Sequence, residues 1–138
     1  MRSPQLRPAV ALSAFTLLVW TTRIRNIWTD DALSTAGQVG RTALALAFTA
    51  FAVAVLGVWW QGRRAGGRTA PWAPTLVRAF AVWTVGVWVV RATQIALADH
   101  DTGFVVVHTV LAVVSIGLAA WADRAAHTSL ERERVHAA

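Results

Sequence analysis

Four long apolar segments separated by short polar ones make up nearly the whole chain. They cover residues 8–29, 42–60, 75–98 and 103–121. A helix needs about 20 mainly apolar residues to cross a hydrocarbon core of about 30 Å, and each segment comes close to that length. The pattern therefore predicts an all-α membrane protein that folds as a bundle of four transmembrane helices.

Helix breakers mark the predicted ends of these spans. Pro8 stands in the first helical turn, where its missing N–H costs nothing. The segment 61–74 combines three glycines, two prolines and three arginines, so we expect a flexible basic loop there. Residues 127–138 are charged and are expected to form a polar cytoplasmic tail, either a short helix or disordered. One membrane domain, residues 1–126, precedes this tail.

The composition supports a bilayer environment and limits the classes of molecule that the protein is expected to bind. Of 138 residues 56% are apolar and 14% are charged, which leaves too few polar groups to cover a water-soluble domain. The net charge of +6 comes with arginines in short turns between apolar spans, where anionic lipid headgroups are the expected partners and nucleic acid is not. The absence of cysteine excludes disulfides and thiolate metal sites. We expect no cofactor and no bound metal.

The distribution of arginine predicts the orientation, because cytoplasmic loops carry the positive excess. One side of the predicted bundle has nine arginines and the other has four, which are Arg23, Arg25, Arg41 and Arg91. The side with nine includes the flanks of both termini. We therefore expect a multi-pass protein of the cell membrane with both termini in the cytoplasm.

An internal repeat is visible when the chain is shifted by 68 positions. Residues 16–31 then align with 84–99 and share six identities in sixteen positions, among them Trp20 with Trp88 and Arg23 with Arg91. Each half, 8–60 and 75–121, contains two spans, so both halves would have the same orientation. We predict two parallel two-helix repeats related by an axis near the membrane normal.

The repeat draws attention to polar residues inside the spans. Arg23 and Arg91 each lie eight residues before an aspartate, about 12 Å of helix inside the outer end. An ionised group at that depth costs about 2.5 kcal/mol or more unless it pairs, snorkels or faces a polar cavity. Asn26 and Gln94 follow these arginines by three residues and so lie on the same helix faces. His108 is expected at nearly the same depth in the fourth span.

Two interpretations of these residues remain open. In the first, Arg23, Asn26, Arg91, Gln94 and His108 form a cluster of hydrogen-bond donors in the outer leaflet that binds an anion, as in a transport or channel-like protein. In the second, the arginines reach to the membrane boundary and pair with Asp30, Asp31, Asp99 or Asp101. The protein would then be a non-catalytic accessory or scaffold protein that binds anionic lipid or another membrane subunit.

Other features of the sequence point to no further chemistry. His108 and Ser115 are about 10.5 Å apart along one helix, too far for a catalytic hydrogen bond, and we find no enzyme signature. Trp20, Trp83 and Trp88 lie deep in their spans and are expected to face the bundle. Small residues spaced by four, such as Ala50 with Ala54, allow close helix approach within the bundle or between two copies in a homodimer.

Overall fold

Four long α-helices and one short 3-10 helix form the structure, a computed structural model that describes residues 1, 3–29 and 34–137. The short helix η1 (Ser3–Leu6) leads into α1 (Arg7–Trp28). It is followed by α2 (Thr35–Arg64), α3 (Ala73–Ala96) and α4 (Thr102–Ala137). The described residues contain no strand, which confirms the all-helical prediction.

Three of the helices, α2, α3 and α4, are long and apolar enough to cross a membrane. They also carry large apolar side chains on their outer faces, for example Val53, Val82 and Val113, each more than half exposed. Exposed apolar surface of this extent is typical of contact with lipid. The helix α1 does not reach the same level of hydropathy among the described residues, since it contains three arginines.

The polar ends of the helices follow local sequence signals. Pro8 and Pro74 lie in the first turns of α1 and α3. The side chain of Ser34 accepts a hydrogen bond from the Gly37 N–H at the start of α2, and Asp101 does the same for Phe104 at the start of α4. Such N-caps satisfy amide groups that have no partner within the helix.

Two helices extend beyond the predicted spans into polar sequence. The helix α2 begins seven residues before the predicted span and runs through residues 61–64, so the loop that follows it starts at Ala65. Gly66 and Gly67 have φ of 66° and 89°, a conformation that favours glycine, and there the chain turns. The helix α4 continues without a break to Ala137, so residues 127–137 are helical.

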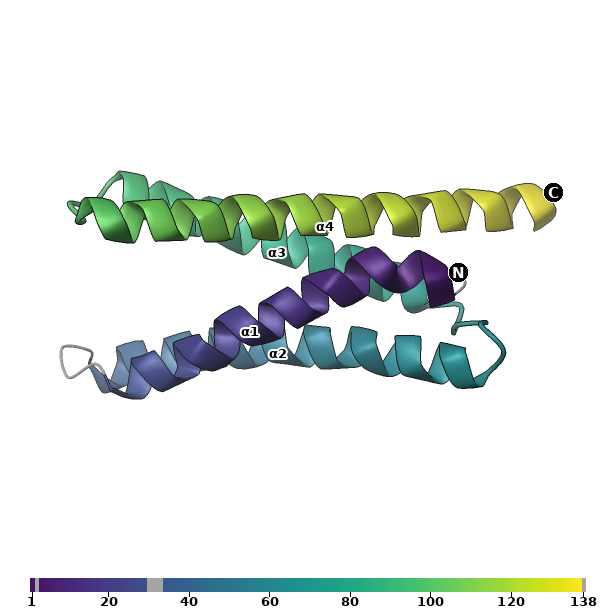
Figure 1. Ribbon diagram of the computed structural model, residues 1–138, viewed down its shortest axis with the longest axis horizontal. Coiled ribbons are helices and arrows are strands. Elements are labelled where there is room, and N and C mark those ends of the chain that lie inside the picture. Colours follow the sequence, from purple (N-terminus) through teal and green to yellow (C-terminus); the bar gives the residue numbers. More distant parts are fainter. Residues whose placement is uncertain (2, 30–33, 138) are drawn as a thin grey trace.

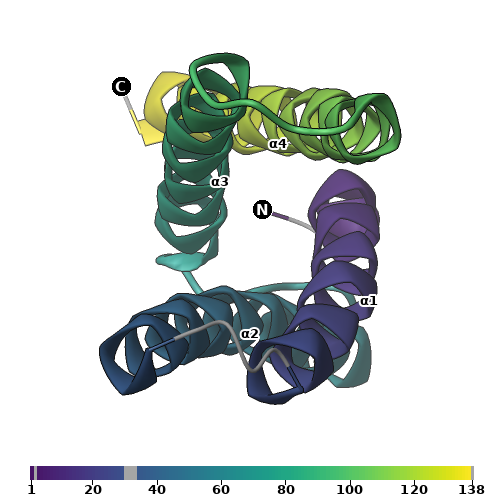
Figure 2. The same cartoon turned by 90° about the vertical axis from the view of Figure 1, so that its left-hand side faces the viewer.

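In the view along the bundle, the four helices lie along the four sides of a square (Figure 2). The helices α2 and α4 occupy opposite sides, while α1 and α3 run diagonally between them (Figure 1). The helix α1 packs against α2 and α3 packs against α4, whereas contact between α2 and α3 is more limited. The helices α1 and α3 both finish at the same end of the bundle, which we call the site end (Figure 1). We call the opposite end the terminal end, because the first residues of the chain lie there and α4 extends beyond it.

The core lies in the middle and towards the terminal end, and small residues allow its helices to approach closely. Ala45 and Ala52 of α2 and Ala119 and Ala122 of α4 are fully buried, as is Leu6 of η1. Aromatic rings fill the space between them, with Trp20 stacked on Phe48 at 4.4 Å between ring centroids. In lipid, such van der Waals packing and not water exclusion holds helices together. Ala50 and Ala54 are exposed and take no part in this core.

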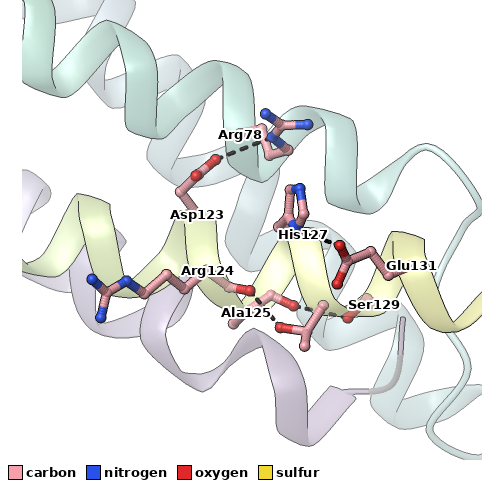
Figure 3. A network of polar contacts seen from close by, with 8 residues as sticks. Arg78, Asp123, Arg124, Ala125, His127, Ser129 and Glu131 are labelled. Atoms are coloured by element: carbon pink, nitrogen blue, oxygen red, sulfur yellow. Dashed lines mark hydrogen bonds and ion pairs between the residues drawn. The ribbon is translucent and has the colours of Figure 1, made fainter.

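Polar contacts at the terminal end join α4 to its neighbours. The Arg78 side chain of α3 donates to Asp123 of α4 at 3.1 Å (Figure 3). Further along α4, His127 lies 3.4 Å from Glu131 on the same exposed face (Figure 3). The side chains in these contacts are exposed, so each contact adds little to stability.

Burial repeats between the two halves in a regular way. Six of the seven buried residues of α1 fall on buried residues of α3 when 68 is added to their numbers, among them Leu12, Thr16 and Trp20. For α2 and α4 the corresponding shift is 67, which places five of the six buried residues of α2 on buried residues of α4. The N-caps Ser34 and Asp101 are also 67 residues apart.

Candidate functional site

Polar side chains from all four helices gather towards the site end of the bundle. Arg23 comes from α1, Arg91 from α3 and His108 from α4, and a third arginine, Arg41, comes from α2. Arg23 and Arg91 are half-buried and His108 is only 8% exposed. The side chains of Arg23, Arg91 and His108 therefore project between the helices, whereas the Arg41 side chain is exposed.

These residues line two adjoining cavities that share part of their walls. The first, which we call the apolar cavity, has a volume of about 420 Å³ and is lined mainly by aromatic and aliphatic side chains. The second, the polar cavity, has a volume of about 330 Å³ and lies closer to the site end. Five residues line both: Arg23, Asn26, Ile27, Arg41 and Arg91.

Each residue predicted for the site lies at one of these cavities. Arg23, Asn26 and Arg91 line both, Gln94 lines the polar cavity and His108 lines the apolar one. The i, i+3 spacing on α1 and α3 thus places the cation and the carboxamide of each helix on the same wall. The structure brings the five residues together, while their role in binding stays a prediction.

His108 is held in one tautomer by its two neighbours. Its Nδ1 lies 2.8 Å from the Phe104 carbonyl oxygen, and its Nε2 lies 3.3 Å from Nη1 of Arg23. A carbonyl only accepts and a guanidinium only donates, so Nδ1 carries the proton and Nε2 accepts from Arg23. The ring also stacks on Phe104, with 3.9 Å between centroids. In this arrangement the imidazole is neutral.

Arg23, Arg41 and Arg91 have no acidic partner among the described residues. Neither cavity is lined by a described carboxylate, and neither Arg41 nor Arg91 forms a hydrogen bond or an ion pair within residues 1, 3–29 and 34–137. Asp101 caps α4 and does not pair with Arg91. The predicted partners Asp30 and Asp31 lie outside the described residues. The charges of Arg23, Arg41 and Arg91 are close enough to repel one another.

Arg41 was missed as a site residue because the second span was predicted to begin at Thr42. Its helix starts at Thr35, so Arg41 lies within the second turn of α2. The signal that could have revealed it is Ser34, a preferred N-cap residue just before a stretch without proline. Arg25 is exposed, as Arg41 is, but it lines neither cavity.

The two buried tryptophans of the site confirm one prediction, and a third tryptophan departs from it. Trp20 is 8% and Trp88 is 6% exposed, and both line the apolar cavity. Trp83 contacts Phe48 and Phe51 at its ring edge but remains 38% exposed. No group of three histidine, aspartate or glutamate side chains that could hold a metal ion occurs in the described part of the chain.

The site can therefore offer several N–H donors and at least three positive charges to a single bound group. Guanidinium groups bind carboxylate, sulfonate and phosphate oxygens through charge-assisted hydrogen bonds. Comparison with family models, curated proteins and solved structures finds no match to this chain, so its function has to be argued from the site itself.

Proposed function

We propose that this protein is an anion-binding integral membrane protein, with the anion held by Arg23, Arg41 and Arg91. The observation that carries the proposal is the convergence of three guanidinium groups on shared cavities to which the described residues contribute no carboxylate. Arginines gathered without counter-charge repel one another and lose solvation by partial burial. A bound anion offsets both effects.

The proposal includes four membrane spans and cytoplasmic termini in the cell membrane. With 22 residues α1 is about 33 Å long, enough to span, and its arginines Arg23 and Arg25 lie towards the site end. The first residues lie at the opposite end from the cavities and α4 extends beyond that same end, in agreement with an even number of crossings (Figure 1). The excess of arginine at that end supports its cytoplasmic location.

The internal repeat is part of the proposal and has two registers. A shift of 68 relates α1 to α3 and a shift of 67 relates α2 to α4, as the positions of buried residues support. In the second register Arg41 corresponds to His108. The site would then be pseudo-twofold, with Arg23 matched by Arg91 and Arg41 matched by His108.

The packing of the bundle favours a binding protein or carrier over an open channel. Beyond the cavities, towards the terminal end, fully buried side chains such as Leu12, Phe80 and Ala126 fill the interior. An anion that enters from the site end meets this core and goes no further in the conformation described. Transport would require the two helix pairs to move relative to each other.

The test is to remove the two repeated arginines and measure anion binding. Wild-type protein and the variant R23Q/R91Q are reconstituted in zwitterionic nanodiscs, and the binding of radiolabelled methanesulfonate and phosphate is measured by equilibrium dialysis. We expect the double variant to lose at least tenfold in affinity, since each charge-assisted hydrogen bond contributes about 1.5–3 kcal/mol. The variant R25Q serves as the matched control, because Arg25 lines neither cavity, and should bind as wild type does.

The same variants decide between the two interpretations of the arginines. Equal binding by wild type and R23Q/R91Q would refute an anion site. If the double variant instead inserts differently or loses a membrane partner on co-purification, with no effect on anion binding, the accessory-protein interpretation holds. Flux of the same anions into proteoliposomes shows whether binding leads to transport.

A further inference from the structure

The composition of the apolar cavity is unusual for a site that binds only a small inorganic anion. Apart from the arginines, Thr22, Asn26 and His108, its walls are apolar and include Phe15, Leu18, Trp20, Leu44, Trp88 and Leu111. A chloride or phosphate ion bound to the guanidinium groups would leave these walls without a partner. Ligand cavities with an apolar wall and a few polar groups at one end are typical of amphipathic ligands.

The two adjoining cavities place a charged region directly beside an apolar region. Arg23, Arg41 and Arg91 line both cavities and thus stand at their junction. The apolar region extends from that junction towards the core, and Phe15 lies eight residues, about 12 Å of helix, from Arg23. An extended chain advances about 1.2 Å per bond, so this distance matches about ten bonds.

We propose that the ligand is a single-chain anionic amphiphile, with a carboxylate, sulfonate or phosphate head at the three arginines and a medium-length alkyl chain in the apolar cavity. This inference rests on the proposed function and specifies its substrate class. The volume of about 420 Å³ lies in the range of cavities that bury small organic ligands. The two tryptophans Trp20 and Trp88 offer flat apolar faces to the chain.

The choice of a single chain follows from the limited space and from the position of the walls. All four helices contribute to the apolar cavity, with Leu44 from α2, Val87 from α3 and Leu111 from α4 facing the chain from different sides. The cavity is partly open and has room for one medium-length chain, so a phospholipid with its headgroup at the arginines would leave at least one long chain outside it. The proposal therefore predicts that the bulk phospholipids of the membrane do not compete for the site.

Equilibrium dialysis with probes of different chain length tests the inference. Binding of methanesulfonate, butanesulfonate and octanesulfonate to the protein in zwitterionic nanodiscs is measured, and binding to empty nanodiscs is subtracted to correct for partition into the bilayer. A methylene group that leaves water for an apolar site improves affinity by about fourfold. We expect octanesulfonate to bind at least tenfold more tightly than methanesulfonate, and octanol, which lacks the charge, to bind at least tenfold more weakly than octanesulfonate.

Two variants fill the apolar cavity and leave the arginines intact. L111W should reduce the affinity for octanesulfonate at least tenfold more than the affinity for methanesulfonate, which has no long chain to accommodate. L18W places a large ring on the same wall from a side chain that is 65% exposed, so it is easily tolerated by the fold and should give the same selective loss. Thermal melting and size-exclusion profiles identify a variant that has failed to fold.

The possible results separate this inference from the proposed function. Equal affinity for methanesulfonate and octanesulfonate, both lost in R23Q/R91Q, would leave an anion site but overturn the amphiphile. Competition by nanodiscs that contain phosphatidylglycerol would also overturn it, by showing a two-chain lipid in the site. If no sulfonate binds above the empty-nanodisc level, the proposed function itself fails.

Discussion

Acidification should strengthen anion binding at this site, and His108 should be the residue responsible. In the structure His108 is neutral, because Nδ1 donates to the Phe104 carbonyl and Nε2 accepts from Arg23. A proton added at Nε2 would face the Arg23 N–H, so the hydrogen bond breaks. The imidazolium then becomes a fourth cation at the site.

The size of the effect follows from two opposing terms. A unit charge about 5 Å from the bound anion, at an effective dielectric constant of about 20, contributes about 3 kcal/mol. The loss of the hydrogen bond between Arg23 and His108 costs about 1.5 kcal/mol, since one partner is charged. The net gain of about 1.5 kcal/mol corresponds to about tenfold in affinity. Other charges that face His108 are Arg91 of α3, Arg41 of α2 and His100 before α4, and the arginines stay ionised throughout.

The assay is equilibrium dialysis of methanesulfonate at a series of pH values from 8 to 5. The sulfonate remains ionised throughout, so only the protein changes charge. We expect affinity to rise about tenfold as pH falls in wild type and to stay constant in H108Q, whose amide oxygen can still accept from Arg23. The control H100Q, which removes the histidine that lines the polar cavity, should keep the rise. A rise that persists in H108Q, or an affinity that falls on acidification, would refute the reasoning.

Three further predictions concern the site and the core. R41Q should weaken methanesulfonate binding about tenfold, as R91Q does, through loss of one charge-assisted hydrogen bond; wild-type affinity in R41Q would contradict the assignment of Arg41 to the site. The chain has no natural cysteine, so single-cysteine variants can be labelled selectively. N26C and Q94C should react with a membrane-impermeant thiol reagent added at the site end, while S13C and T84C, which are buried in the core, should not. Reaction of S13C or T84C would show an open interior. F48A should destabilise the fold by about 3–5 kcal/mol, because Phe48 is 1% exposed and stacks on Trp20, and the lipid-facing variant L46A should change the melting temperature far less; similar losses in both would show that Phe48 is not a core residue.

Much of the helical architecture could be predicted because apolar length is a strong signal. The starts and ends of α1 and α3 fall within two residues of the predicted spans, since proline and polar residues bound both helices. The convergence of Arg23 with Arg91 also followed from sequence, because two similar helices with a polar residue at i+3 expose similar faces. The repeat and the polar residues inside the spans thus identified five of the residues that line the two cavities.

What the sequence pattern missed lies where helices run into polar sequence. Hydropathy ends at Trp121, yet the residues that follow are good helix formers and α4 continues through them to Ala137. The start of α2 was misplaced for the same reason, and with it Arg41. The contact of Arg23 with His108, 85 residues apart, depends on how α1 lies against α4, which no local pattern specifies.

The two pairs of helices can act as stiff levers because their strongest contacts lie within each pair. The helices α1 and α2 form one arm and α3 and α4 the other; α1 also packs against α4, while contact between α2 and α3 is limited. Over an arm of about 33 Å, a relative rotation of about 5° at the terminal end would change the separation at the site end by about 3 Å. Arg23, Arg41 and Arg91 lie towards the site end of these two arms. A small tilt would therefore change the distances between the three side chains, and with them the binding or release of an anion.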